Sequence, residues 1–208
     1  MLLTVYGHWK HLCSKLLIES GVDEAFEDIR RHYAEAHRHY HVLGHIQHCL
    51  DEFSPIEPHF NVTNAAVMRA ALILHDAIYD PHRQDNEEQS VVYSRGLWKG
   101  FGIGSRFVDA VSSHILATKT HRHPGTIDTA YVLDIDLAIL GQPADIFDVY
   151  ERNIRLEYSW VPEVDYRMGR RKVLESLMRP RIYYTRYFQD KYEANAQENL
   201  KRSLVALS

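Results

Sequence analysis

The sequence has few cysteines, no long apolar run and no excess of positive charge. Its two cysteines, Cys13 and Cys49, do not form a CxxC pair and are too few for a disulfide framework. No apolar run approaches the roughly 18 residues of a membrane span. The formal net charge of −4 gives no general attraction to nucleic acid or anionic membranes. The first residues lack a basic start followed by a long apolar core, so we expect a cytoplasmic protein without a signal peptide.

Strand patterns and phosphate-binding loops are also missing. Residues 100–105 are rich in glycine, but no Gly-Lys-Ser/Thr follows them, so they indicate a turn. No segment shows the sustained alternation of apolar and polar residues that is typical of half-buried strands. Repeats, low-complexity runs and Ser/Gly linkers are absent as well. We therefore predict a single all-α domain over residues 1–208, with additional C-terminal helices.

Apolar residues at helical spacing predict where these helices lie. The expected helices cover residues 6–20, 23–36, 41–53, 64–76, 87–96, 105–119, 127–140 and 143–154, with two or three more between 163 and 207, broken near Pro180. Asp23 and Asn64 are expected to cap their helices, and Pro143 is expected in a first turn.

Histidine is the abundant residue: there are fourteen, many of them between His32 and His123. The apolar run 72–74 leads directly into His75 and Asp76. A neutral imidazole next to a carboxylate could be half of a divalent metal site, and burying that carboxylate without a cation or hydrogen bonds would be costly. The competing interpretation is a helix end with a core histidine and a solvated aspartate, which is the more common meaning of so short a motif.

Further histidines and carboxylates occur at suggestive spacings. On the expected helix, His41, His45 and His48 share one face, where surface histidines are more often solvated than metal-bound. Val42 occupies the position of the glutamate of a zincin, so the segment is not a metalloprotease motif. Asp134 and Asp136 lie two apart on a helix, so only one of them is expected to face a given site.

Charged side chains elsewhere have two interpretations each. Glu87 and Glu88 fit the acidic first turn of a helix, or could order water or a ligand histidine. Lys119 and Arg122 fit a solvated loop, or could capture a phosphate. The arginines and tyrosines after residue 163 could bind nucleic acid, but the acidic net charge argues against it.

Taken in order, His45, the His75-Asp76 pair and a distant aspartate resemble the HD superfamily of metal-dependent phosphohydrolases. The resemblance implies an HD-domain helical bundle with a core over about residues 23–142 and a C-terminal extension over 143–208. It also implies a divalent metal ion, which could be Mn, Fe, Co, Ni or Mg, bound by His45, His75, Asp76 and Asp136. Asp136 is preferred to Asp134 because the residues around it resemble the family's final motif, but the choice stays open. If Asp136 is the ligand, Asp134 would support the ligands without binding the metal itself.

Residues 40–45, Tyr-His-Val-Leu-Gly-His, resemble the Tyr-His-Asn-x-x-His element of cyclic-nucleotide phosphodiesterases, with Val42 in place of asparagine. This likeness implies that His41 protonates the leaving oxygen. Segments 75–80, 86–90 and 133–141 resemble a bacterial group known only as predicted HD phosphohydrolases, and the likeness covers most of the chain. His114 and His121 could serve a second metal ion.

The expected function is hydrolysis of a phosphate monoester or diester, on a nucleotide-like or other small phosphorylated substrate. Asp76 would bind the metal and orient the attacking water, and Glu87 would support the ligands. Lys119 and Arg122 would hold the phosphate. The alternative is an HD fold that senses a nucleotide or binds a partner without turnover.

Overall fold

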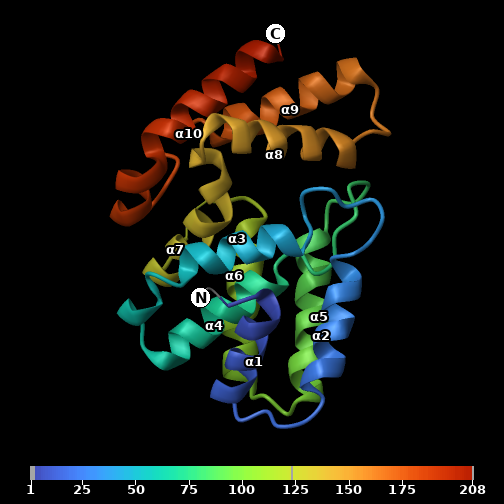
Figure 1. Ribbon diagram of the computed structural model, residues 1–208, viewed down its shortest axis with the longest axis vertical. Coiled ribbons are helices and arrows are strands. Elements are labelled where there is room, and N and C mark those ends of the chain that lie inside the picture. Colours follow the sequence, from blue (N-terminus) through green and yellow to red (C-terminus); the bar gives the residue numbers. More distant parts are fainter. Residues whose placement is uncertain (1–2, 123, 208) are drawn as a thin grey trace. The chain divides into compact units, whose positions relative to one another are not determined.

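The computed structural model describes residues 3–122 and 124–207, and no strand occurs among them (Figure 1). The all-α prediction is therefore confirmed. Within the described part, none of the helices is both long and apolar enough to cross a membrane. The chain divides into two compact units, residues 1–132 and 133–208.

The first unit holds most of the helices. They are α1 (Val5–Lys15), α2 (Val22–His32), α3 (Leu43–Phe53), the 3-10 helix η1 (Glu57–His59), α4 (Val62–Leu74), α5 (Asn86–Gly100) and α6 (Ser105–Thr118). Helix α7 (Ile127–Asp136) begins in this unit and ends in the second. The second unit continues with the 3-10 helix η2 (Leu137–Gly141), α8 (Ala144–Glu157), α9 (Glu163–Leu177) and α10 (Arg186–Ala206).

Helix α4 forms the centre of the first unit. Every residue from Ala65 to Leu74 is buried, and the helix packs against α1, α3 and α6. A helix that is apolar around its whole circumference has to be surrounded by other elements. The Asn61 side chain caps α4 by accepting the Asn64 N–H at 2.9 Å. The cap thus lies three residues earlier than the predicted Asn64.

Several predicted helix ends shift for local reasons. Helix α3 begins at Leu43, so His41 lies in the preceding turn and not on the helix as predicted. Helix α1 ends at Lys15 because Leu17 takes a left-handed conformation and the Ile18 N–H bonds back to the Cys13 carbonyl, as in a Schellman motif. Gly21, with φ of 72°, is the N-cap of α2 in place of the expected Asp23.

In the second unit, α10 packs against η2 and α9. Phe188 and Leu200 of α10 are buried in its core, together with Phe147 and Leu174. The two helices after residue 163 match the prediction, and Pro180 lies between them. Pro143 is the N-cap of α8, one position before the predicted first turn.

Candidate metal centre

Three side chains from α3 and the end of α4 converge in the first unit. His45 Nε2 lies 3.1 Å from His75 Nε2, and His75 Nε2 lies 3.1 Å from an Asp76 carboxylate oxygen. The same oxygen is 3.6 Å from His45 Nε2. Both histidines are buried, and the Asp76 side chain is 15% exposed. The predicted grouping of these three residues is thus found in the structure.

These spacings fit a divalent ion. Ligand atoms about 2.1 Å from one ion at neighbouring positions lie about 3.0–3.4 Å apart, which is close to the three observed separations. The His75 Nδ1 lies 3.1 Å from the Leu72 carbonyl oxygen, which can only accept a hydrogen bond. That bond fixes the proton on Nδ1, so the Nε2 lone pair of His75 points at the other two ligand atoms. Two imidazoles and a carboxylate suit a divalent transition metal or zinc.

The turn after α4 orients His75 and Asp76. Helix α4 ends at Leu74, His75 is its C-cap, and the Ala77 N–H bonds back to the Leu74 carbonyl at 3.1 Å. The chain therefore leaves the helix axis at the point where both ligands occur in sequence. As a result, the pair can face the His45 side chain while the apolar residues before it stay in the core.

Arg38 stabilises this turn through hydrogen bonds to its main chain. Its guanidinium donates to the main-chain carbonyls of Asp76 at 2.6 Å, Ala77 at 3.0 Å and His41 at 3.1 Å. Glu35 accepts from Arg38 Nε at 2.9 Å and balances the buried charge. The sequence pattern does not single out Arg38, because two of the three carbonyls it binds lie 38 and 39 residues away.

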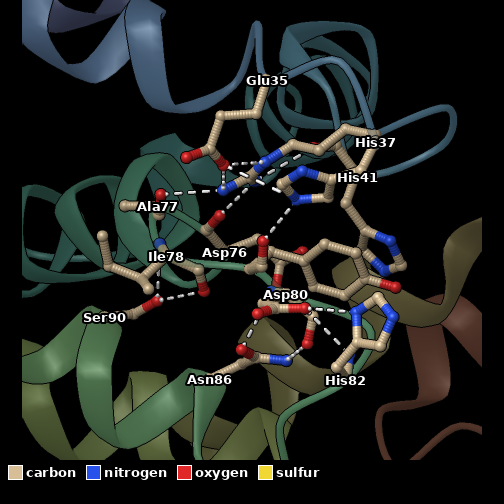
Figure 2. A network of polar contacts seen from close by, with 12 residues as sticks. Glu35, His37, His41, Asp76, Ala77, Ile78, Asp80, His82, Asn86 and Ser90 are labelled. Atoms are coloured by element: carbon tan, nitrogen blue, oxygen red, sulfur yellow. Dashed lines mark hydrogen bonds and ion pairs between the residues drawn. The ribbon is translucent and has the colours of Figure 1, made fainter.

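Side chains at the start of α5 bind the main chain of residues 78 and 80, which follow the His75-Asp76 pair. Asn86 accepts the Asp80 N–H and donates to the Asp80 carbonyl, both at 3.0 Å (Figure 2). The Ser90 hydroxyl likewise accepts from the Ile78 N–H and donates to the Ile78 carbonyl, both at 3.1 Å. Residues 86–90, which carried part of the family resemblance, therefore fix the loop next to the ligands.

His41 lies near the three ligands although it precedes α3. Its ring stacks on Tyr79 with centroids 4.1 Å apart and is 6.0 Å from the His45 ring. The stacking restricts the rotation of the imidazole and places it beside the candidate ligands. Its role as a proton donor stays a prediction.

Cys49 is a further candidate ligand that sequence reasoning missed. The residue is fully buried one turn after His45, and its sulfur lies 3.8 Å from both nitrogens of the His45 ring. The four-residue spacing on one helix face could have indicated this neighbour.

Glu87 and Glu88 have different surroundings. Burial raises the pKa of Glu87, and the nearby Asp76 carboxylate raises it further. Glu88 instead forms an ion pair with Lys119, which also donates to the Gln84 carbonyl at 2.8 Å. Arg122 is exposed. The supporting role of Glu87 and the phosphate contacts of Lys119 and Arg122 stay predictions.

The two aspartates of α7 belong to the second unit. Asp134 is fully buried and accepts from the Tyr184 N–H, the Thr185 N–H and the Thr185 hydroxyl, each at 2.7 Å. Burial raises its pKa to about 6, against the lowering effect of these bonds. Asp136 is the last residue of α7 and partly exposed. Its assignment as the fourth ligand, and a supporting role for Asp134 at the metal, stay predictions.

The remaining candidates have other partners. His114 is buried in α6 with Nδ1 3.1 Å from the Thr129 hydroxyl, and burial lowers its pKa. It belongs to no potential metal cluster in the described part of the chain, and the second metal at His114 and His121 stays a prediction. In the C-terminal region, Arg170 pairs with Glu151 and Arg186 with Asp190, so part of the positive charge there is neutralised.

Comparison with known proteins gives no relative: no family model, no curated protein and no solved structure matches this chain.

Proposed function

We propose that the chain is a divalent-metal-dependent phosphohydrolase that hydrolyses a phosphate monoester or diester on a nucleotide-like or other small phosphorylated substrate. The convergence of His45 Nε2, His75 Nε2 and the Asp76 carboxylate carries the proposal. The three donor atoms lie within 3.6 Å of one another, the two histidines are buried, and a divalent ion would compensate the charge of the largely buried Asp76 carboxylate.

The surroundings of the residues in the proposed site support a role for each of them in metal binding or catalysis. The bound ion would lower the pKa of its water molecule and polarise a phosphoryl oxygen of the substrate. His45 and His75 hold the ion, and the Leu72 carbonyl keeps the His75 lone pair directed inward. The Asp76 carboxylate would also hold the ion and help to orient the attacking water. We propose Asp136 as the fourth ligand on the family resemblance.

His41 is the proposed proton donor. Leaving an alkoxide unprotonated is unfavourable near neutral pH, so an imidazole within reach of the leaving oxygen accelerates the reaction. The Tyr79 ring holds His41 beside His45. Lys119 and Arg122 are proposed to hold the phosphate, which requires Lys119 to exchange its Glu88 partner for the substrate.

Metal analysis and phosphate release from the Asp76→Ala variant test the function. The protein as isolated is analysed by mass spectrometry of the elements, then assayed with Mn, Co or Mg on phosphate monoesters, phosphate diesters and nucleotides. We expect near-stoichiometric metal in the wild type and at least about a 100-fold loss of both metal affinity and activity in Asp76→Ala. Asp145→Ala, an exposed carboxylate of α8, is the matched control and should behave as wild type.

Metal content and activity that both survive Asp76→Ala would contradict the proposal. Tight nucleotide binding without product under any of the metals would instead favour the non-catalytic sensing module. A metal-loaded protein with neither activity nor nucleotide binding would support the metal centre but contradict the proposed phosphohydrolase activity.

A further inference from the structure

The first unit contains a cavity with both charged and apolar side chains in its lining. Its volume is about 290 Å³, and α1, the segment around η1, and α4 form its walls. Four ionisable side chains line it, His11, Lys15, Glu57 and Arg69, beside apolar residues that include Phe60 and Val62. None of the three candidate metal ligands lines this cavity.

Arg69 gives the cavity a buried positive charge. The residue is 2% exposed, and its guanidinium forms an ion pair with Glu57 and donates to His8 Nδ1. The Phe53 ring covers the group at 5.3 Å. A guanidinium has five N–H donors, so these two partners leave several donors of Arg69 to be used. Such a cation is costly to bury unless its charge is balanced.

The balance of charge in the lining is positive. His8 accepts from Arg69, and burial together with the Arg69 charge lowers its pKa to about 4, so it is neutral near pH 7. Glu57 is the single carboxylate of the lining, against the two cations Arg69 and Lys15. Lys15 is exposed at the rim of the cavity and forms no ion pair with any residue in the described ranges. Two positive charges and one negative charge leave one positive charge.

We propose that this cavity binds a small monocarboxylate that carries an apolar group. The carboxylate would be held by Lys15 and by the unused donors of Arg69, and would complete the charge balance of the lining. The apolar group would lie against Phe60 and Val62. The cavity is at the small end of ligand sites, which favours a compact ligand of about the size of an aromatic acid.

His11 should make the binding of a carboxylate in this cavity dependent on pH. Three groups in the lining act on it: Lys15 from its own helix, Arg69 from α4 and Glu57 from η1. Burial, Arg69 and Lys15 lower the pKa of His11, and Glu57 raises it. A bound carboxylate would favour the protonated ring, so binding should take up protons and strengthen as the pH falls from about 7 to about 5.5.

Calorimetric titration of the full chain with benzoate tests the proposal. We expect saturable one-site binding that is unchanged by EDTA, because the candidate metal ligands lie outside the cavity. Acetate should bind more weakly, because it lacks the apolar ring, and benzylamine should not bind. Lys15→Glu should weaken benzoate binding at least about tenfold, since it replaces a charge-assisted hydrogen bond by repulsion.

Lys10→Glu is the matched control, because Lys10 lies on the same helix, is exposed and is not part of this lining. It changes the net charge equally and should alter binding less than about twofold. His11→Gln should retain binding but lose its pH dependence between about 7 and about 5.5. Equal loss in both lysine variants, binding of benzylamine as tight as that of benzoate, or no benzoate binding at millimolar concentration would overturn the proposal.

Discussion

At the scale of single residues, the candidate centre depends on groups that do not touch a ligand atom. Arg38 is 5% exposed and holds three main-chain carbonyls of the loops that carry His41 and Asp76. Tyr33 adds a bond from its hydroxyl to the Ile73 carbonyl at 2.8 Å, within the last turn of α4. Two side chains from the segment before α3 thus fix the main chain around His75 and Asp76.

Arg38→Met should loosen the turn and weaken metal binding. The change keeps most of the apolar stem but leaves three carbonyls without their donor, so we expect a loss of about 2–4 kcal/mol in the free energy of unfolding. Metal affinity should fall about 10- to 100-fold, as it does when groups that orient ligands are removed. Urea unfolding and metal titration measure the two effects.

Arg31→Met provides the control for the loss of an arginine. Its guanidinium is 70% exposed and pairs with Asp28 on the surface of α2. Unfolding free energy should change by less than about 0.5 kcal/mol, and metal affinity should not change. Similar effects for both arginines would mean that Arg38 does not brace the turn.

At the scale of elements, close approach of two helices defines the second unit. An added Cβ at Gly141, the last residue of η2, would lie 2.7 Å from Tyr192 Cγ on α10. The Asn199 side chain of α10 donates to the Leu140 and Gln142 carbonyls on either side, both at 2.9 Å. Glycine is therefore required here for packing, since only a residue without a side chain lets α10 come so near.

Gly141→Ala should destabilise the second unit by about 1–3 kcal/mol, because the methyl group overlaps Tyr192 and forces α10 to move. Urea unfolding followed by circular dichroism measures the change.

Gly169→Ala is the control: it lies within α9 and has no atom within 4 Å of an added Cβ. That change should stabilise the chain by up to about 1 kcal/mol, because alanine is the better helix former. Opposite signs for the two substitutions are expected, and a neutral Gly141→Ala would contradict the close packing.

At the scale of the whole molecule, the candidate centre joins helices that are distant in sequence but belong to one unit. His45 comes from α3 and the His75-Asp76 pair from the end of α4, and both lie within residues 1–132. A metal ion can bind at this centre only when the ligand side chains are held together by the folded chain, so it should stabilise the first unit by mass action.

Removal of metal with EDTA should therefore lower the thermal stability of the protein. A free metal concentration 100 times the dissociation constant corresponds to about 2.7 kcal/mol. Trp9 and Trp98 are buried in the first unit, so a Trp160→Phe background makes tryptophan fluorescence report on that unit. The Asp76→Ala variant should show no difference with and without EDTA, and an equal shift in both proteins would locate the stabilising metal elsewhere.

The sequence predicted the helical class and most helix positions, because apolar spacing and the lack of strand patterns act locally. Errors fell at the ends of helices: His41 precedes α3, and Asn61 caps α4 in place of Asn64. Helix ends depend on a few main-chain bonds, such as the Ile18 bond to Cys13, that compete closely in energy. Local patterns therefore give the existence of a helix better than its limits.

The sequence by itself determined which residue types could form a metal site, since His45, His75 and Asp76 stand out by chemistry and order. Tertiary structure decided that their ligand atoms converge within 3.6 Å, and it added Arg38 and Cys49 to their surroundings. It also paired Asp134 with Tyr184 and Thr185, which lie 50 and 51 residues later in the sequence. Contacts of that kind depend on how the helices pack. The spacing of apolar residues shows which face of a helix is buried but not which element packs against it.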